Sequence, residues 1–171
     1  MSRKIIAVDV TRCMACHSCE IACAVAHSAS KTLAGALAES PRQRPRVHVE
    51  HVAGRPVPIQ CQHCDDAPCV AACPSGAVSR AGPEEPVLFD SARCIGCRMC
   101  VQACPFGAIT IGPDGKGVLK CDLCIERLSR GVEPACVSAC PTRALRFEDV
   151  DQATRRKRRT ASANLLSGET K

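Results

Sequence analysis

Residues 120–141, KCDLCIERLSRGVEPACVSACP, contain four of the chain's sixteen cysteines, and their spacing decides how the chain is interpreted. The stretch opens with C-x-x-C and closes with C-x-x-x-C-P, and eleven residues lie between the two halves. C-x-x-C pairs are typical of zinc sites, whereas an ending in C-x-x-x-C-P is typical of another metal-binding run. The stretch is therefore either a self-contained site or one half of a site that another part of the chain completes.

The remaining cysteines form three further groups of four. CMACHSCEIAC and CIGCRMCVQACP both have the spacing of bacterial ferredoxins, and CQHCDDAPCVAACP has two extra residues before its third cysteine. In chain order the quartets are Cys13, Cys16, Cys19 and Cys23; Cys61, Cys64, Cys69 and Cys73; Cys94, Cys97, Cys100 and Cys104; Cys121, Cys124, Cys136 and Cys140. They predict four [4Fe–4S] clusters. Zinc gives no reason for three C-P endings, and it stays an alternative mainly for the fourth quartet.

Ferredoxin geometry predicts how the quartets combine. The first three thiolates of a run wrap one cluster, and the fourth ligates the other cluster of a pair. We expect each fourth thiolate at the start of a helix that points away from the first cluster, with the next proline fixing the chain direction. Cys23 is followed by Ala24 instead, so its helix is expected to continue through Ala26. The predicted ligand sets are Cys13, Cys16, Cys19 and Cys140; Cys121, Cys124, Cys136 and Cys23; Cys61, Cys64, Cys69 and Cys104; Cys94, Cys97, Cys100 and Cys73.

This pairing implies an α+β fold of two pseudo-symmetric bacterial ferredoxin-like units, the central one inserted into the outer one. Residues 58–111 make the central unit, with VPIQC, AVSR, VLFD and AITI as short strands. Residues 1–57 and 112–150 make the outer unit, with strands in IIAVDV, RVHVEHV, VLKC and ALRFEDV. We expect the insert 125–135 to be a surface loop. KTLAGALAES, residues 31–40, predicts a short helix before a loop, and this segment is either a partner surface or a plain connection.

The amino-acid composition supports an interior that contains metal cofactors. The chain of 171 residues has three Phe and no Trp or Tyr, so large rings cannot fill its core. The N-terminus lacks the apolar region of a signal peptide, and no run is long enough to cross a membrane. These features predict a cytoplasmic chain, in which a disulfide framework is disfavoured. No nucleotide-binding glycine loop or catalytic triad is present, and every cysteine is assigned, so we expect a non-catalytic protein.

The formal net charge of +6 does not indicate a nucleic-acid-binding protein. Residues 151–171 carry six basic and two acidic residues, and each oxidised cluster with its four thiolates adds a charge of about −2. Without aromatic residues in the tail, stacking on bases is excluded there. The basic block 155–159 either docks on a partner or is disordered. His17 and His63 lie inside cysteine loops and are expected to pack beside a cluster or to donate a hydrogen bond to its sulfur.

The phrases CQHCDDAPCVAACPSGAV, CIGCRMCVQACPFGAI and KCDLC…PACVSACPTRAL resemble the four-cluster, polyferredoxin-like iron–sulfur subunits of complex oxidoreductases. Dimethyl sulfoxide reductase, formate dehydrogenase and polysulfide reductase have such subunits. Compact versions accompany carbon monoxide dehydrogenase, hydrogenases and tungsten aldehyde oxidoreductases. The resemblance covers about residues 3–148 and implies four [4Fe–4S] clusters in a line, with the crossed ligand sets given above. The short chain without a hydrophobic anchor indicates a compact soluble member.

The resemblance implies an electron-transfer subunit that relays single electrons between a catalytic subunit and another carrier. The implied partner is a tungsten or molybdenum enzyme, a carbon monoxide dehydrogenase or a hydrogenase, with a flavin subunit or further copies of the chain as other contacts. A free polyferredoxin that diffuses between enzymes is the alternative.

Overall fold

The computed structural model describes residues 3–113, 115 and 117–167. In chain order the elements are β1 (Lys4–Val8), η1 (Val10–Arg12), α1 (Ser18–His27), α2 (Leu33–Ala38), β2 (Val47–Val52), β3 (Arg55–Gln60), α3 (Pro68–Ala71), β4 (Val78–Ser79), β5 (Leu88–Phe89), η2 (Ser91–Arg93), α4 (Met99–Ala103), β6 (Ile109–Ile111), β7 (Val118–Lys120), α5 (Ile125–Leu128), α6 (Ala135–Ser138), β8 (Leu145–Asp149) and α7 (Val150–Ser167). The strands of the described residues form four antiparallel pairs, β1–β8, β2–β3, β4–β5 and β6–β7. The mixture of short helices and strands is that of the expected ferredoxin-like fold.

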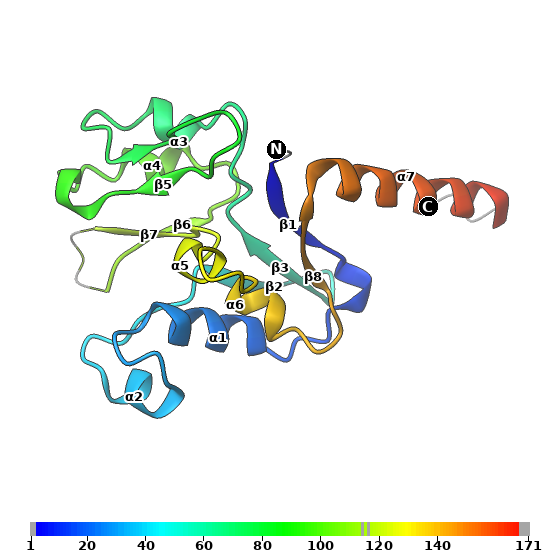
Figure 1. Cartoon of the computed structure of the whole chain (residues 1–171), viewed down its shortest axis with the longest axis horizontal. Coiled ribbons are helices and arrows are strands. Elements are labelled where there is room, and N and C mark those ends of the chain that lie inside the picture. The colour runs from blue at the N-terminus through cyan, green and yellow to red at the C-terminus, as the bar shows by residue number, and fades with distance from the viewer. Residues whose placement is uncertain (1–2, 114, 116, 168–171) are drawn as a thin grey trace.

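The first strand, β1, pairs with the last strand, β8, which precedes the C-terminal helix α7 (Figure 1). The strand β1 buries Ile6 and Ala7; Ile6 lies opposite Phe147, and Val8 lies opposite Leu145. Beyond the pair, the Asp9 N–H donates to the Ala144 carbonyl at 2.8 Å. The strand before the first quartet is therefore hydrogen-bonded to the strand after the fourth.

The second and third quartets are connected in the same way. β4 pairs with β5, and the Asp90 N–H donates to the Ala77 carbonyl at 2.8 Å. The side chains of Asp9 and Asp90 each accept a hydrogen bond from the backbone two residues on, which starts the 3₁₀ turns η1 and η2. These turns end directly before Cys13 and Cys94. The same local structure thus leads into the first and the third quartet.

Two hairpins run across the predicted domain boundaries. The boundary at 57/58 falls inside β3, which pairs with β2. The boundary at 111/112 falls at the end of β6, which pairs with β7. Strands assigned to different units are therefore partners in one hairpin, and the division into an inserted and an outer unit stays a prediction.

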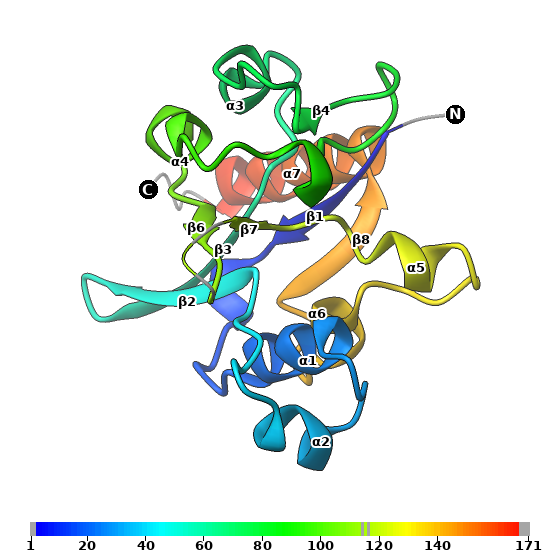
Figure 2. The same cartoon turned by 90° about the vertical axis from the view of Figure 1, so that its left-hand side faces the viewer.

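Cysteines make up a large part of both hydrophobic cores of the described residues. One core contains Cys19, Cys23, Cys121 and Cys136 with aliphatic side chains such as Leu145. The other contains Cys69 and Cys100 together with aliphatic side chains of the strands β4, β6 and β7. Figures 1 and 2 place α3, α4 and β4 at one end of the molecule and α1, α2 and α6 at the other. The quartets thus occupy the interior that aromatic rings would otherwise fill.

The helices of the cysteine motifs differ from the expectation. The fourth cysteines were expected at helix starts, but Cys73, Cys104 and Cys140 follow the ends of α3, α4 and α6. The helix instead contains the third cysteine of each motif. The proline after the fourth cysteine explains this, because it disfavours helical conformation in the residue before it. Where Ala24 replaces that proline, α1 continues to His27, as expected.

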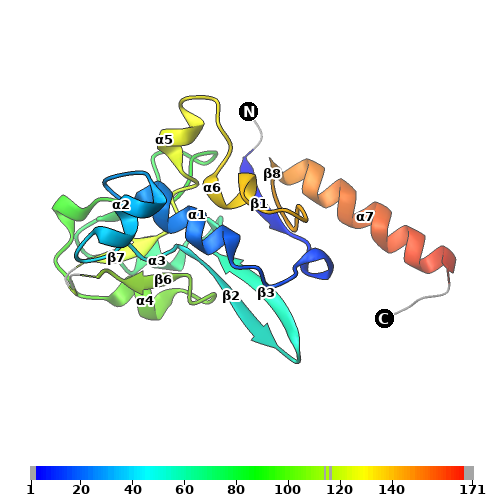
Figure 3. The same cartoon turned by 90° about the horizontal axis from the view of Figure 1, so that it is seen from below.

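Two further segments adopt helices. The insert 125–135 was expected to be a loop, but it begins with the helix α5. The segment 31–40 contains the predicted short helix, α2. Most of the basic tail belongs to α7, which packs against β8 and β1 and projects away from the other elements (Figure 3). Residues 168–171 of the tail lie outside the described residues. Within the described part of the chain, no helix has the length and apolarity needed to span a membrane.

Candidate iron–sulfur centres

The first predicted ligand set lines a single cavity. Cys13, Cys16 and Cys19 come from the loop between η1 and α1, and Cys140 comes from the far end of the chain, after α6. The cavity also touches His17, Val49 and Leu145. Cys23, the fourth cysteine of the first motif, does not line it. The structure thus combines three thiols of the first motif with one of the fourth.

A second cavity has the same organisation. Cys61, Cys64 and Cys69 line it together with Cys104. Its remaining walls include His63, Val87, Phe106 and Ile109. Two cavities with the same four-cysteine lining suit the same kind of group.

Electrostatic effects on the thiol pKa values indicate which cysteines lie near one another in the two other predicted sets. Burial raises the pKa of Cys136, and the nearby Cys121, Cys23 and Cys124 raise it further. Burial likewise raises the pKa of Cys100, with Cys73 and Cys97 acting in the same direction. Cys94 precedes Cys97 in the same loop. Cys23 is thus beside the fourth motif and Cys73 beside the third.

The four cysteine loops share one backbone feature. The residue before the second cysteine has a positive φ in each: Ala15 (57°), His63 (47°), Gly96 (73°) and Leu123 (57°). In two loops the N–H of this residue donates to the first thiol, from His63 to Cys61 and from Leu123 to Cys121, at 3.4 Å. Left-handed residues curl a loop so that successive N–H groups face a common centre, which suits an anionic group. Only the third motif signals this conformation in its sequence, with Gly96.

The fourth thiols of three motifs accept backbone hydrogen bonds, and Cys23 Sγ accepts one from the Arg46 N–H at 3.2 Å. Cys73 Sγ accepts from the Val78 N–H at 3.4 Å, and Cys140 Sγ accepts from the Ala144 N–H at 3.2 Å. Hydroxyl groups two residues on, in Ser75 and Thr142, lie 3.7 and 3.8 Å from these sulfurs. Burial acts in the opposite direction, but the hydrogen bonds lower the pKa of both Cys73 and Cys140.

The most buried thiols need a cation to ionise. Burial raises the pKa of Cys121, and it raises that of Cys19 to about 11. A metal ion reverses this effect, since a coordinated thiol is deprotonated outright. Soft thiolates select iron–sulfur clusters or zinc. The thiol-lined cavities and buried sulfurs therefore fit [4Fe–4S] clusters.

The position of Cys140 disfavours a zinc site made of the fourth quartet alone. A zinc site within this quartet would bring Cys140 together with Cys121, Cys124 and Cys136. Instead, Cys140 lines the cavity of the first motif, and the nearby charge of Cys23 acts on both Cys121 and Cys136.

The sets follow one another through neighbouring cysteines. Cys19 of the first predicted set raises the pKa of Cys136, which belongs to the second. Cys61 of the third predicted set raises the pKa of Cys121, which also belongs to the second. The third and fourth sets share α3, which contains Cys69 and ends just before Cys73. Exposed cysteines belong to the two outermost sets, Cys16 to the first and Cys97 to the fourth.

Two basic residues that sequence reasoning missed support this site. Arg80 donates to the carbonyls of His63 (2.7 Å), Cys64 (2.6 Å) and Asp65 (3.1 Å), which fixes the second cysteine loop. Lys120 is 3% exposed and donates to the carbonyls of Val87 and Cys121. The lysine directly before C-x-x-C was the available signal, but sequence does not show that it is buried.

The two histidines inside the motifs have different surroundings. His17 Nδ1 lies 2.7 Å from a carboxylate oxygen of Glu20. His63 is buried, and burial lowers its pKa to about 3, with Lys120 and Arg80 acting in the same direction. His63 is therefore neutral at physiological pH.

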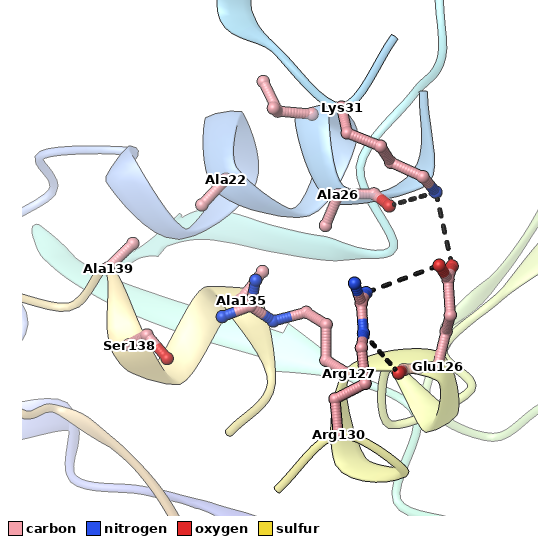
Figure 4. Close-up of a pocket in the computed structure, with 10 residues that line it drawn as sticks. Ala22, Ala26, Lys31, Glu126, Arg127, Arg130, Ala135, Ser138 and Ala139 are labelled. Atoms are coloured by element: carbon pink, nitrogen blue, oxygen red, sulfur yellow. Dashed lines mark hydrogen bonds and ion pairs between the residues drawn. The ribbon is translucent and has the colours of Figure 1, made fainter. Parts of the chain in front are cut away.

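A separate surface hollow lies between α1, α5 and α6 (Figure 4). Ala22, Ala26, Ala135 and Ala139 line it, and charged side chains stand at its edge. Lys31 donates to the Ala26 carbonyl at 2.8 Å, and Glu126 approaches Lys31 and Arg130 at 3.5 and 3.4 Å. The hollow has no thiol in its lining and is no candidate metal site.

The fold and the cysteine sets define an iron–sulfur protein. Residues 52–150 match the model of the 4Fe-4S dicluster domain family, and the chain belongs to this family. It is similar to an iron-sulfur protein of Rhodospirillum rubrum, with 44% identity over 159 residues that cover 86% of this chain and 83% of the relative.

Two relatives are named for their roles. The thiosulfate reductase electron transfer subunit PhsB of Salmonella typhi is 38% identical over 150 residues, which are 85% of this chain and 75% of the relative. The electron transport protein HydN of Escherichia coli is 37% identical over 177 aligned positions, which cover 93% of this chain and 97% of the relative. The expected resemblance to iron–sulfur electron-transfer proteins is confirmed.

Proposed function

We propose that the chain is the electron-transfer subunit of an oxidoreductase complex and holds four [4Fe–4S] clusters on the crossed ligand sets. The observation that carries this proposal is the four-cysteine lining of two cavities, each with three cysteines from one motif and one from another. Cys16 and Cys97, which belong to the first and last sets of the proposed series, are exposed. Each cluster, when bound, accepts and releases one electron. The first and last sets are then the places where electrons enter and leave.

The chain's own residues hold and insulate these groups. Cys121, Cys124 and Cys136 are buried, so water is kept from the middle of the series. The curled loops and the N–H groups directed at sulfur stabilise negative charge. Arg80 and Lys120 add fixed positive charge beside the third set. These are the means by which a protein sets cluster potentials.

The partner surface is proposed around the exposed ligands. Met14, between Cys13 and Cys16, is 62% exposed, and Ile95, between Cys94 and Cys97, is 67% exposed. Exposed apolar side chains beside a redox centre suit contact with another protein. The name of PhsB, an electron transfer subunit of thiosulfate reductase, supports a catalytic partner. The proposed catalytic partner is a tungsten or molybdenum enzyme, a carbon monoxide dehydrogenase or a hydrogenase.

An anaerobic reductive titration tests the relay. The purified chain should take up about four electrons, one for each cluster. Because the sets are neighbours, the reduced protein should show spin–spin coupling in its electron paramagnetic resonance spectrum. An uptake of two electrons or fewer, or reduced centres without magnetic coupling, would contradict a four-cluster relay.

A free electron carrier is the second candidate. HydN, which aligns over 97% of its own length, is named an electron transport protein without mention of a complex. Anaerobic purification from the native cell under gentle conditions separates the candidates. A catalytic subunit that co-purifies in a fixed ratio supports the subunit, whereas a stable monomer that passes electrons to several enzymes supports the carrier.

A further inference from the structure

His63 is a buried polar side chain in the wall of a cysteine-lined cavity. It is 2% exposed and lies in the second motif, between Cys61 and Cys64. The cavity that it lines is the one bounded by Cys61, Cys64, Cys69 and Cys104. Nothing in the ligand assignment uses the imidazole, because four thiols already complete the set.

The hydrogen bonds around the ring fix its tautomer. The Val87 N–H donates to His63 Nδ1 at 3.1 Å, which requires a lone pair on Nδ1. The single ring proton is therefore on Nε2. Lys120 Nζ donates to the Val87 carbonyl at 2.5 Å, and this contact holds the residue that orients the imidazole.

The Nε2–H donor has no acceptor within the part of the chain that the structure describes. Its atom is buried, and no partner lies within hydrogen-bond distance among these residues. Buried donors are nearly always paired, so an unpaired one requires an explanation. The cavity that His63 lines is bounded by four cysteines, and a cluster held there would offer sulfur acceptors.

We propose that His63 donates its Nε2–H to a sulfur of the cluster held by Cys61, Cys64, Cys69 and Cys104, and thereby raises the reduction potential of this cluster. The inference rests on the proposed function, since it needs a cluster in this cavity. Hydrogen bonds to sulfur are among the protein's controls of cluster potential, because they stabilise the more negative, reduced state.

His17 provides a matched comparison. It also lines a cysteine-lined cavity, but its Nδ1 already contacts Glu20, and its side chain is 43% exposed. Water and the carboxylate can satisfy this ring without a cluster sulfur. His63 is therefore assigned as the tuning residue.

Potentiometric titration followed by electron paramagnetic resonance tests the proposal in the cluster-loaded protein. In His63→Leu, one midpoint potential should fall by about 59 mV, which is a tenfold decrease in the equilibrium constant for one-electron reduction. The other midpoint potentials should not change. His63→Gln retains a side-chain N–H and should recover part of the shift. His51→Leu, at an exposed histidine outside the cysteine loops, should leave the potentials unchanged.

A second readout uses the unaltered protein. Electron–nuclear double resonance of protein labelled with ¹⁵N only in histidine should detect a histidine nitrogen coupled to one cluster, and this coupling should disappear in His63→Gln. If His63→Leu fails to assemble, this signal alone decides, and its absence overturns the inference. Unchanged potentials in His63→Leu with full iron content also overturn it but leave the proposed function intact. A wild-type cavity without a cluster refutes the proposed function itself.

Discussion

The side chain of Lys120 links the segment before the third cysteine motif with the first cysteine of the fourth motif. Its ammonium group is buried and donates to the carbonyls of Val87, at 2.5 Å, and Cys121, at 2.9 Å. No carboxylate forms an ion pair with it among the described residues. Its positive charge acts on Cys69, where it opposes the effect of burial on the pKa. We therefore expect the thiolates and clusters around it to be its counter-charge.

Replacement of Lys120 tests this role. Lys120→Met leaves two buried carbonyls without a donor, and the free energy of unfolding of the cluster-loaded protein should fall by about 2 kcal/mol. Anaerobic urea denaturation, followed by cluster absorbance, measures the change. Lys31→Met is the control, since Lys31 also donates to a carbonyl but is exposed. Equal denaturation midpoints for Lys120→Met and wild type would contradict this role.

At this scale the sequence indicates the metal ligands but not their supporting residues. Cysteine spacing is a local property, so the four quartets can be predicted from it. Arg80 and Lys120 act on carbonyls that lie up to 33 residues away along the chain, and no local pattern records such contacts. The left-handed conformation of His63 could not be predicted either, because among the residue types only glycine indicates a positive φ in a sequence.

Among the elements, α7 was the least predictable. The basic run within it is typical of solvated segments, yet the structure forms an 18-residue helix. Ala153 is 4% exposed where the helix packs against β8 and β1, and Arg156 pairs with Glu148. The Val150 N–H also donates to the Arg3 carbonyl at 3.0 Å. One small buried side chain and one ion pair thus fix a helix whose other residues are mostly exposed.

A charge at the buried position should release this helix. Ala153→Glu places a carboxylate against the β1–β8 pair, at a cost of about 1–3 kcal/mol. Trypsin cleavage within residues 155–159 should become about tenfold faster, while the iron content stays unchanged. Ala161→Glu, at an exposed position of α7, should be cleaved like the wild type. Similar cleavage of both variants would show that packing at Ala153 does not hold the helix.

The other elements follow from simpler rules. The strands β1 and β8 and the helix α2 were predicted from alternation and composition. The prediction was wrong for the fourth cysteines, which follow their helices, because the effect of proline on the residue before it was not taken into account. It was also wrong for the insert 125–135, because the first four residues of the expected loop form the helix α5.

For the whole molecule, the pairing of distant quartets is the main organising feature. Hydrogen bonds connect β1 with β8, and Cys140 lies with Cys13, Cys16 and Cys19 around one cavity. Ferredoxin geometry predicts this arrangement from the sequence. The hairpins β2–β3 and β6–β7 were not predicted, because strand partners across a unit boundary depend on the tertiary fold.

Substitution of one cysteine tests the crossed pairing. In Cys140→Ser, the thiols released from metal should be Cys13, Cys16 and Cys19, because these line the cavity with Cys140. Anaerobic alkylation and peptide mass spectrometry identify the released thiols. In the matched variant Cys23→Ser, the released thiols should be Cys121, Cys124 and Cys136. Release of Cys121, Cys124 and Cys136 in Cys140→Ser would show that the fourth quartet is self-contained.

The iron and zinc content of the anaerobically purified chain tests the central claim most directly. Four [4Fe–4S] clusters require about sixteen iron atoms per chain and no zinc. About twelve iron atoms with one zinc would mean that residues 120–141 hold a zinc site, and this result would contradict the four-cluster relay.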